Sequence, residues 1–414
     1  MKHIYTSIDF GSDTIKIVVA ELFQNKINLL ASTSTKSKGI KKGLITDVDL
    51  ALESVRNAIN ETEELLGLKI KKVIASVPSF NVEYSIIKGD IKLNSEQSVV
   101  TTDDILNSLE VAVRSVQFNM REMITILPVD YTLDNTAFIK NPLGMKGTTL
   151  GCKAVLVTVP KKNVYSVVTL LEKLGIEVVD ISINNLGDLY SFNTKDFENQ
   201  TGAIINIGSD ITSVSIYNKS ILLKSSIINI GGMNIDNDIS YMYKVDQKTA
   251  SKLKLKFALG HKKNASVNDI IEVKNVQDEA IKINQFEISE IVMSRTEEIL
   301  NEAKKEINLL TSKKIDYIII TGGTSNITNF EYVARDVFGE NASIGNVKVL
   351  GIRDNIYSAC IGNLVYFINK LKLKNQNYSM ISDNEMYQIT SFATRKLNTS
   401  DSMLGKLFGY FFSE

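Results

Sequence analysis

The sequence predicts an α/β fold built from two related halves. Short runs rich in valine and isoleucine, each stopped by glycine or proline, alternate along the chain with longer segments of helical periodicity, and this alternation is typical of α/β architecture. The chain has 414 residues, whereas one ordinary core takes about 100–200, so two or more domains are expected. The tripeptide Gly-Ser-Asp occurs twice, at residues 11–13 and 208–210, each time after a similar apolar run. A repeated turn in a chain of this length indicates two halves of similar order.

Composition indicates a folded protein and disfavours several kinds of chemistry. Apolar residues make up 44% of the chain and charged residues 23%, as in folded soluble proteins. The 47 lysines and arginines balance the 47 aspartates and glutamates, so no basic field attracts nucleic acid, and no nucleic-acid partner is expected. The two cysteines lie far apart and the chain has only two histidines, which disfavours disulfides, zinc sites and histidine-based catalysis. We expect no signal peptide and no membrane-spanning segment, because we find no apolar run of the required length.

The strands and helices are expected in the following order. A short apolar run ending at Phe10 leads into the first Gly-Ser-Asp turn, and a second strand, TIKIVVAEL, leaves it. Further short buried strands are expected at residues 71–78, 153–160, 202–208 and 316–323. Helices are expected at residues 48–68, 164–176 and 286–310. The last has an apolar face, formed by Ile288, Ile291, Val292, Ile299 and Ile307, and this predicts a long amphipathic helix.

Residues 80–151 interrupt this alternation with strands and a helix of their own. The helix, TTDDILNSLEVAVRSV at residues 101–116, opens with a Thr-Asp cap signal. We therefore expect an inserted subdomain here. Residues 374–401 are rich in Asn, Ser, Gln, Lys and Thr without a strong period, which is typical of a flexible linker.

The two Gly-Ser-Asp turns are candidate phosphate-binding hairpins, because each follows one strand and precedes another. The matching residues are Ile8, Gly11, Ser12 and Asp13 in the first turn and Ile205, Gly208, Ser209 and Asp210 in the second. Glycine lets backbone N–H groups point toward an anion, and serine or threonine adds hydroxyl donors. Two such hairpins facing each other would hold one polyphosphate from both sides. For either turn alone, a tight turn without a ligand remains the alternative.

Together with two later segments, these hairpins resemble the actin/Hsp70/sugar-kinase superfamily of ATP-binding proteins, whose two related halves each carry one phosphate hairpin. Residues 228–243, INIGGMNIDNDISYMY, are similar to the Gly-Gly segment of the superfamily and to the asparagine and Asp-Ile that follow it in the bacterial division family FtsA. Residues 318–339, IIITGGTSNITNFEYVARDVFG, are similar to the adenosine motif, a strand that ends in Gly-Gly and is followed by a helix. The four motifs occur in the order that the superfamily has.

The inserted segment points to one family within the superfamily. Residues 127–147, LPVDYTLDNTAFIKNPLGMKG, are similar to the FtsA pattern of Pro-x-x-Tyr, an aspartate and Ile-Lys-x-Pro-x-Gly-Met-x-Gly. The resemblance to FtsA extends from about Ile4 to Phe367. It implies an actin-like fold of two halves with an interdomain nucleotide cleft, an FtsA-type inserted subdomain and a C-terminal amphipathic helix.

The resemblance also implies a division of the chain into subdomains. The first actin-like subdomain would consist of residues 1–79, 152–200 and 355–373, and the inserted subdomain of residues 80–151. The second would consist of residues 201–232 and 311–354, with a small, partner-binding subdomain at 233–310. The flexible linker at 374–401 would join this body to an amphipathic membrane-targeting helix at 402–414.

Carried over position by position, the resemblance implies the residues that hold ATP and Mg²⁺. Asp9 would hold Mg²⁺ through water, since a hard carboxylate suits a hard ion. Phosphate donors and a cation would come from the first hairpin, at Gly11, Ser12, Asp13, Thr14 and Lys16. The second hairpin would close from the other side with Asn206, Gly208, Ser209, Asp210 and Thr212. The ribose, inner phosphates and adenosine would lie near Gly231, Gly232, Asn234, Lys254, Gly322, Gly323, Thr324 and Ser325.

Three departures from the family pattern concern hydrolysis. Hydrolytic relatives usually carry an aspartate where this chain has Asn206, and an amide cannot act as a carboxylate toward Mg²⁺ or water. Ser213 stands where many members have a carboxylate or histidine, and Ser251 replaces a glutamate that is common before the helix lysine. We therefore expect ATP binding with at most slow hydrolysis, assign no catalytic residue, and expect that Asn206→Asp would speed hydrolysis.

The last residues, SMLGKLFGYFFSE, form a candidate amphipathic helix. Leu404, Leu407, Phe408 and Phe411 fall at i, i+3, i+4 and i+7, on one face of a helix. Such a segment is too short to span a bilayer. It would be a helix docked on the body, a contact between subunits or an anchor lying in the membrane plane. The polar linker before it and the FtsA resemblance both favour the membrane anchor.

Taken together, these features predict a division protein. We expect an ATP-binding, actin-like protein that polymerises with its own kind on the cytoplasmic face of the cell membrane at the division site, as a peripheral protein. It would tether the division polymer FtsZ by binding its C-terminal peptide, with Arg295 as a candidate contact. A small-molecule kinase of the same superfamily, an Hsp70-type chaperone and a pilus-assembly ATPase are the alternatives.

Overall fold

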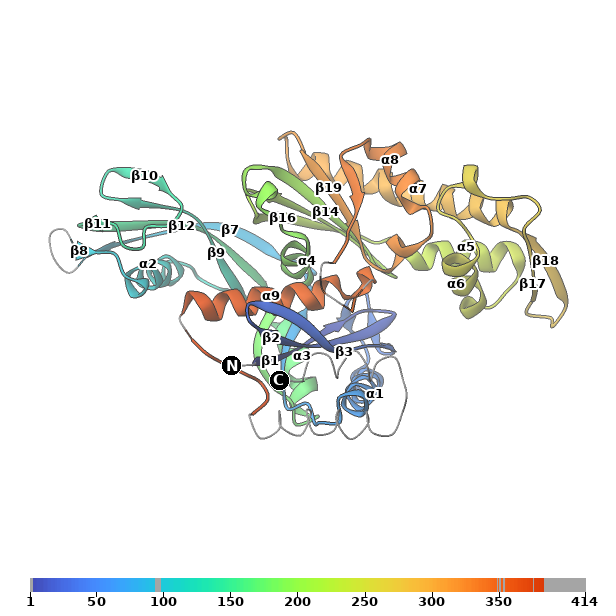
Figure 1. The fold of residues 1–414 in the computed structure, drawn as a ribbon, viewed down its shortest axis with the longest axis horizontal. Coiled ribbons are helices and arrows are strands. Elements are labelled where there is room, and N and C mark those ends of the chain that lie inside the picture. Colours follow the sequence, from blue (N-terminus) through green and yellow to red (C-terminus); the bar gives the residue numbers. More distant parts are fainter. Residues whose placement is uncertain are drawn as a thin grey trace.

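The structure of the protein, a computed structural model, describes residues 3–382 except 94–97, 348, 350, 353 and 375. Figure 1 shows four lobes. Two of them contain one five-stranded sheet each and lie one above the other, and the remaining two extend to opposite sides. We call them the first lobe, the second lobe, the inserted lobe and the small lobe, and give the elements of each below. The mixed α/β class predicted from the sequence is confirmed.

The first lobe contains a five-stranded sheet and two helices. Its elements are β1 (His3–Phe10), β2 (Thr14–Phe23), β3 (Lys26–Lys36), β6 (Lys72–Val77), β13 (Glu177–Ile183), α1 (Val48–Leu66) and α3 (Lys161–Glu172). The strand order is β13-β6-β1-β2-β3, with β1 antiparallel to β2 and parallel to β6. All residues of β1 from Ile4 to Phe10 are buried, as expected for a strand covered on both faces. The Asp47 carboxylate accepts hydrogen bonds from the first turn of α1, so the cap fixes where this helix begins.

The second lobe repeats this arrangement. Its elements are β14 (Thr201–Ile207), β15 (Thr212–Asn218), β16 (Ile221–Ile228), β19 (Tyr317–Thr321), β20 (Ala342–Ile344) and α8 (Phe330–Phe338). The strand order is β16-β15-β14-β19-β20, with β14 antiparallel to β15 and parallel to β19. In both lobes a strand therefore enters a tight hairpin and also pairs in parallel with a later strand. This shared topology confirms the two related halves predicted from the repeated Gly-Ser-Asp turn.

Two helices pack against each other between the two sheets, α4 (Asn184–Phe192) and α9 (Ser358–Leu373). Their backbones touch at two glycines. A Cβ atom on Gly362 would lie 1.6 Å from the carbonyl oxygen of Gly187, and one on Gly187 would lie 2.3 Å from that of Ala359. Because helix separation depends on the side chains at the contact, a larger residue at either position would push α4 and α9 apart.

The inserted lobe has its own sheet and core. Its elements are β7 (Glu83–Lys92), β9 (Arg121–Leu133), β10 (Thr136–Ile139), β12 (Thr149–Pro160), α2 (Thr102–Arg114) and the short pair β8 (Ser98–Val99) and β11 (Lys146–Gly147). The main sheet has the order β10-β9-β12-β7. Thr101 and Asp104 form a reciprocal capping box at the start of α2, which confirms the cap signal. β12 continues without a break past residue 151 and contributes Val155 and Val157 to the core of the first lobe, so the boundary expected at 151 falls inside a continuous strand.

The small lobe lies at the opposite end of the molecule from the inserted lobe (Figure 1). Its elements are α5 (Gly232–Tyr243), α6 (Gln247–Lys256), β17 (Ile270–Lys274) and β18 (Ala280–Asn284). The helix α7 (Gln285–Leu310) runs from this lobe to the second lobe. It confirms the long amphipathic helix predicted at 286–310, because Ile288, Val292, Ile299 and Ile307 are buried and Ile291 is half-buried.

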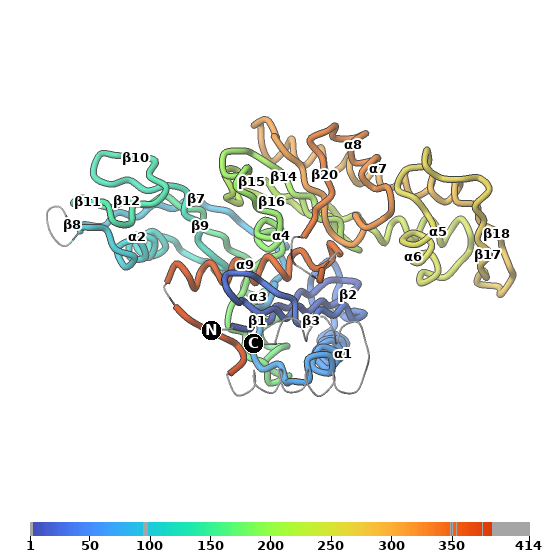
Figure 2. Tube along the Cα trace, in the orientation of Figure 1, coloured from blue at the N-terminus to red at the C-terminus, as the bar shows by residue number. Residues whose placement is uncertain are grey.

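The chain after α9 returns to the start of the first lobe (Figure 2). The Met380 N–H donates to the Ile4 carbonyl at 2.9 Å, and the Ile4 N–H donates to the Ser379 hydroxyl at 3.0 Å. Met380 and Ile381 are buried. The expectation that the linker begins at residue 374 is therefore wrong for residues 378–381, which are part of the core because they pack beside β1. Residues 375 and 383–401 of the expected linker lie outside the described residues, as do the tail residues Leu404, Leu407, Phe408 and Phe411.

The remaining elements are short. They are the strands β4 (Ile40–Lys41) and β5 (Leu44–Ile45) and the 3₁₀ helices η1 (Lys195–Asn199), η2 (Lys262–Asn264), η3 (Gly323–Asn326) and η4 (Asn355–Tyr357). Within residues 3–382, apart from the gaps named above, no helix has the length and apolar character that a membrane crossing requires.

Candidate functional site

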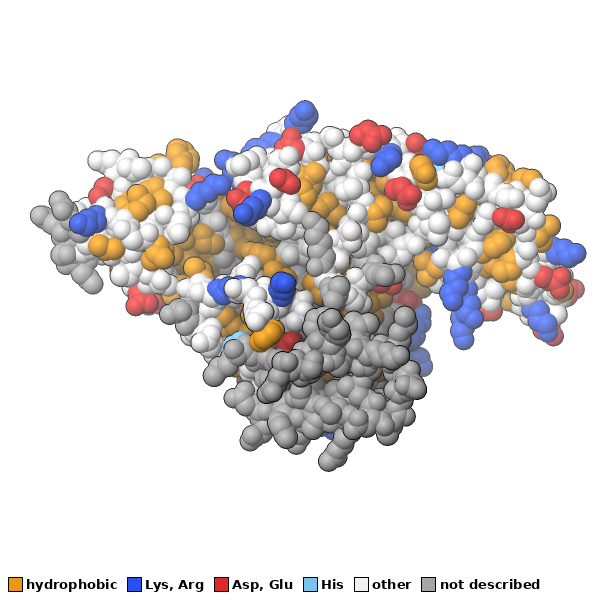
Figure 3. All heavy atoms as spheres, in the orientation of Figure 1, with side chains coloured by type: hydrophobic (Ala, Val, Ile, Leu, Met, Phe, Trp, Pro, Cys, Tyr) orange, Lys and Arg blue, Asp and Glu red, His pale blue; other side chains and the backbone are white. Residues whose placement is uncertain are grey.

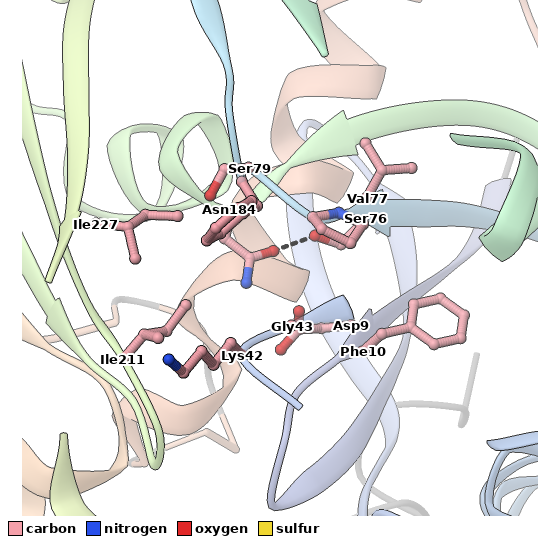
Figure 4. Close-up of a pocket in the computed structure, with 12 residues that line it drawn as sticks. Asp9, Phe10, Lys42, Gly43, Ser76, Val77, Ser79, Asn184, Ile211 and Ile227 are labelled. Carbon is pink, nitrogen blue, oxygen red and sulfur yellow. Dashed lines mark hydrogen bonds between the residues drawn. The ribbon is translucent and has the colours of Figure 1, made fainter. Parts of the chain in front are cut away.

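Both Gly-Ser-Asp hairpins reach one pocket between the first and second lobes. The pocket is lined by Asp9 and Phe10 from β1 and by Ile211 from the turn between β14 and β15. Figure 4 shows Asp9 and Phe10 on one side, Ile211 on the other, and Lys42 and Gly43 between them. The structure therefore brings together two turns that are almost 200 residues apart in the chain.

The turn between β4 and β5 joins the two hairpins. The Gly43 N–H donates to the Ser12 hydroxyl at 3.1 Å, and the Lys42 N–H donates to the Asp210 carboxylate, also at 3.1 Å. Lys42 and Gly43 have φ values of 52° and 76°, a left-handed pair that makes this tight turn possible. Our sequence analysis missed this element, and the Lys-Gly pair between two short apolar runs is the signal that could have indicated it.

A buried ion pair lies beside the first hairpin. The Lys16 ammonium lies 3.1 Å from the Asp9 carboxylate, and both side chains are nearly covered. Burial lowers the pKa of Lys16, but the charge of Asp9 and its hydrogen bond outweigh that effect, so the pKa is raised. The Asp13 carboxylate contacts Lys36 at the surface instead. A Cβ atom on Gly11 would lie 2.6 Å from the Thr14 carbonyl oxygen, so the turn needs a glycine here.

The second hairpin is covered by the predicted Gly-Gly segment. The Gly232 N–H donates to the Gly208 carbonyl and the Met233 N–H to the Ser209 carbonyl, both at 2.8 Å. A Cβ atom on Gly231 would lie 2.5 Å from the Ser209 carbonyl oxygen. This approach therefore requires a glycine.

Two predicted site residues use their side chains within the protein. Thr212 is fully buried, and its hydroxyl donates to the Ile230 carbonyl at 2.8 Å, so only its backbone remains for a ligand. The Asn234 amide oxygen accepts from the Gly231 N–H at 3.0 Å and caps α5. Both residues shape the turns around the cleft.

A second buried ion pair lies below the Gly-Gly segment. Lys254 on α6 donates to the Gly232 carbonyl at 3.0 Å and lies 2.8 Å from the Asp236 carboxylate. Burial raises the pKa of Asp236, and Lys254 opposes this effect. A Cβ atom on Gly232 would lie 3.3 Å from the Lys254 nitrogen and 2.4 Å from the Thr324 hydroxyl. The predicted Lys254 and Thr324 are therefore neighbours across one glycine.

The predicted adenosine turn borders the second hairpin. Gly322 has a φ of 91°, and a Cβ atom there would lie 2.5 Å from the Asn206 amide oxygen and from the Ile207 carbonyl. Gly323, which follows it, opens η3. The Thr324 hydroxyl lies 3.4 Å from the Gly208 carbonyl. Ser325 is buried, and its hydroxyl donates to the Gly322 carbonyl at 2.8 Å, so this side chain holds the turn in place.

Asp188 on α4 is a buried carboxylate of this site that our sequence analysis missed. Its Oδ2 accepts from the Asn206 Nδ2 and its Oδ1 from the Ser358 hydroxyl, each at 2.7 Å. Burial raises the pKa of Asp188 to about 6, and the two hydrogen bonds oppose this effect. An aspartate within the apolar run of a short helix, between Leu186 and Leu189, is the signal that could have indicated it.

A second missed pair, Ser76 and Asn184, lines the pocket itself. The Ser76 hydroxyl donates to the Asn184 amide oxygen, and Figure 4 draws this bond. Ser76 lies near the end of β6 and Asn184 begins α4, so each stands where a strand or helix meets the cleft. Polar residues where strands or helices meet their connecting loops are common at binding sites.

The cleft fits a magnesium ion that arrives with a phosphate ligand. Among the described residues, no group of three or more acidic, histidine or cysteine side chains is placed to hold a metal ion alone. Mg²⁺ keeps several waters and is usually held by one or two carboxylates together with substrate phosphates. Asp9 lines the pocket and would supply one such carboxylate.

Arg295 lies outside the cleft, in an ion pair within the small lobe. Its Nε and Nη2 donate to the two oxygens of Asp238 on α5, at 2.6 and 2.9 Å. Its Nη1 donates to Glu298 at 2.5 Å. The Arg295 side chain is 29% exposed, so a partner would have to share its guanidinium with these two carboxylates.

Comparisons with known proteins agree with the resemblance drawn from the motifs. The family model "Cell division protein FtsA" matches residues 203–362, and the model "SHS2 domain inserted in FTSA" matches residues 81–158. The second match covers the inserted lobe and, like the sheet itself, extends past residue 151.

Whole-chain similarities point the same way. The cell division protein FtsA of Enterococcus hirae is 28% identical over 372 residues, which cover 88% of this chain and 83% of that protein. Among solved structures, a PilM-PilN type IV pilus biogenesis complex has a TM-score of 0.60 at 12% identity, over 87% of this chain and 98% of its own. MreB5 of Spiroplasma citri bound to ADP has a TM-score of 0.54 at 13% identity, over 90% and 99%. These two structures share the actin-like fold, and the two FtsA models with the FtsA relative show that the chain belongs to the FtsA family of cell-division proteins.

Proposed function

We propose that the chain holds one magnesium-bound ATP between its two hairpins and works as an ATP-binding division protein at the membrane. The observation that carries the proposal is the convergence of glycine turns on one cleft. Cβ atoms added at Gly11, Gly231, Gly232 and Gly322 would lie 2.4 to 2.5 Å from neighbouring atoms. The N–H groups of Gly208, Gly231 and Gly232 donate within the protein, so in the proposal the phosphates take N–H groups at the hairpin tips, residues 11–13 and 209–211.

The charges of the cleft suit a polyphosphate with its metal. Lys16 and Lys254 bring two ammonium groups, and each is already held by a buried carboxylate. In the proposal Asp9 holds Mg²⁺ through water while the hairpin backbones donate to the phosphates. The ADP bound to MreB5 of Spiroplasma citri supports a nucleotide as the ligand of this fold.

The arrangement of Asn206 and Asp188 fits ATP hydrolysis that is slow at most. The amide of Asn206 is held by Asp188, and Asp188 itself is 1% exposed. A carboxylate so enclosed has no open path to activate water. Nucleotide binding would then serve as a switch for assembly, as expected of an adaptor.

The partners of this proposal are a second copy of the chain and FtsZ. Apolar side chains are exposed on the inserted and small lobes (Figure 3), among them Met120, Phe138, Tyr241 and Met242. Exposed apolar groups of this kind favour contacts between proteins. We assign self-assembly to such surfaces and the FtsZ C-terminal peptide to the small lobe, where Arg295 would exchange Glu298 or Asp238 for an acidic residue of the peptide.

Attachment to the membrane would come from the tail. The apolar face of Leu404, Leu407, Phe408 and Phe411 lies beyond the described residues, and its role is proposed from the sequence alone. Each buried Leu or Phe contributes roughly 1.5–3 kcal/mol before ordering costs, so one tail binds weakly. A polymer carries many tails and gains avidity, which would place the protein on the cytoplasmic face of the membrane at the division site.

Calorimetry with Mg-ATP on a pair of glycine variants tests the nucleotide site. Gly322→Ala and Gly175→Ala both place alanine at a positive φ, of 91° and 73°, but only the first brings its Cβ into contact with neighbours. We expect Gly322→Ala to lose at least about tenfold in ATP affinity, and Gly175→Ala, which has a positive φ but no contact within 4 Å, to bind as the unmodified chain does. Equal binding by both variants, or no binding by the unmodified chain, would contradict the proposal.

A further inference from the structure

Asp188 differs from the other buried carboxylates of the cleft in its partners. Asp9 and Asp236 are paired with Lys16 and Lys254. The hydrogen-bond partners of Asp188 are the Asn206 amide and the Ser358 hydroxyl, and both are neutral. A buried carboxylate whose hydrogen-bond partners are neutral is expensive, so this arrangement calls for an explanation.

The chemistry of the two side chains fixes the orientation of the amide. An ionised carboxylate only accepts hydrogen bonds, whereas an amide has a donor side and an acceptor side. Asn206 must therefore turn its nitrogen toward Asp188, as it does at 2.7 Å. Its oxygen then faces the other way, where a Cβ atom on Gly322 would lie 2.5 Å from it.

The second oxygen of Asp188 is held just as firmly. Ser358 donates to it at 2.7 Å, and the Thr321 hydroxyl lies 3.2 Å from the Ser358 hydroxyl. Thr321 ends β19 directly before Gly322. These four side chains thus connect α4 and α9 with the ends of β14 and β19, so the carboxylate cannot turn without breaking contacts to both halves of the molecule.

We propose that Asp188 is a positioning residue of the nucleotide cleft, which holds the Asn206 amide so that its oxygen rather than its nitrogen faces the bound magnesium nucleotide. The inference rests on the proposed function. Mg²⁺ keeps several of its waters in proteins, and those waters donate hydrogen bonds, so they require an acceptor at this place. Asn206 supplies the acceptor, while Asp188 behind it supplies the orientation and the negative charge.

An exchange of the two residues tests the pair. In Asp188→Asn the two amides face each other, so the orientation of Asn206 is no longer dictated. In Asn206→Asp two carboxylates meet at hydrogen-bond distance and repel. In the double variant Asp188→Asn with Asn206→Asp, the carboxylate at residue 206 again presents an acceptor to the cleft, and the amide at residue 188 donates to it from behind. Asp134→Asn in the inserted lobe, where the carboxylate accepts from Thr148 and Thr149, is the matched control for loss of a carboxylate.

Calorimetry of the full-length chain measures ATP affinity with Mg²⁺ and with EDTA. We expect Asp188→Asn to weaken Mg-ATP binding at least about fivefold and metal-free ATP binding less than about twofold, and the double variant to recover most of the loss. Asp134→Asn should match the unmodified chain. Thermal unfolding of each variant shows whether it is folded.

A spectroscopic signal reports the orientation directly. The Asn206 side-chain NH₂ resonances, assigned by their loss in Asn206→Asp, should be shifted downfield and protected from exchange in the unmodified chain, and should lose both properties in Asp188→Asn. Equal Mg-ATP affinity in the unmodified chain and in folded Asp188→Asn, or no recovery in a folded double variant, would overturn this inference alone. Failure of the unmodified chain to bind Mg-ATP would overturn the proposed function and the inference together.

Discussion

The raised pKa of Asp188 predicts a specific dependence of stability on pH. Burial raises this pKa from 3.8 to about 6. Between these two values the folded protein keeps a proton that the unfolded chain has lost, so the free energy of unfolding falls as the pH rises. The contribution is fully present below about pH 4 and is lost as the pH passes about 6. A difference of about two pKa units corresponds to about 3 kcal/mol.

The difference between the nucleotide-free chain and Asp188→Asn isolates this effect. For lobes that unfold as units of about 150–250 residues, 3 kcal/mol corresponds to about 6–12 °C in the unfolding midpoint. We expect the midpoint of the unmodified chain to fall by about that much relative to Asp188→Asn between pH 4 and pH 7, measured by circular dichroism. Asp134→Asn is the control, because hydrogen bonds from Thr148 hold the pKa of Asp134 near 2, below this range. Parallel curves for the unmodified chain and Asp188→Asn would refute the reasoning.

Three further predictions concern the cleft, the small lobe and the tail. Lys16→Ala leaves Asp9 buried without its cation, so it should lower the melting temperature and reduce the Mg-ATP affinity in calorimetry by more than about tenfold. Lys36→Ala, at the exposed pair with Asp13, should change stability by less than about 1 kcal/mol. Similar losses in both variants would contradict this prediction. Arg295→Glu adds a third carboxylate to Asp238 and Glu298 and should weaken binding of the FtsZ C-terminal peptide in fluorescence polarisation, and an unchanged affinity would remove Arg295 from that site. Removal of residues 403–414 should leave folding and ATP binding intact but release the protein from sedimenting liposomes. Removal from Tyr378 onward should also lower the melting temperature, because Met380 and Ile381 are buried and contribute roughly 1.5–3 kcal/mol each. If the chain without residues 403–414 still sedimented with liposomes, the membrane anchor would be contradicted.

Sequence patterns predicted the parts of the fold that depend on local order. The hairpin strands, the Thr101 cap and the helix over 286–310 follow from residues close together in the chain, and the structure confirms them. The repetition of Gly-Ser-Asp also predicted that two distant turns belong to similar halves. Their meeting at one pocket depends on how the two lobes pack around α4 and α9 and on the Lys42-Gly43 turn that contacts both hairpins.

The features that the sequence did not reveal depend on contacts between distant segments. Asp188 accepts from Ser358, 170 residues further along the chain, and no local pattern encodes that pair. The Lys42-Gly43 turn matters because it meets Asp210 from the other half. Residues 378–381, Tyr-Ser-Met-Ile, stand within a stretch rich in Asn, Ser, Gln and Lys that resembles a linker. They nevertheless pack beside β1, at the other end of the sequence.

One expectation about hydrolysis changes with these contacts. Asn206→Asp was expected to speed turnover by restoring a carboxylate. In the structure the new carboxylate would face Asp188 at the distance where the amide now donates, 2.7 Å. Two carboxylates this close cannot both ionise freely, so the single variant should lose stability, and only the exchange with Asp188→Asn provides an unopposed carboxylate at residue 206.

Hydrogen–deuterium exchange of the full-length chain with and without Mg-ATP tests most directly whether one nucleotide is held by both hairpins. The backbone N–H groups at the hairpin tips, residues 11–13 and 209–211, belong to different halves of the molecule. If they donate to one polyphosphate, both segments lose exchange together at a single ATP concentration, while β10 in the inserted lobe is unaffected. Protection of only one hairpin, or of neither, would contradict the account.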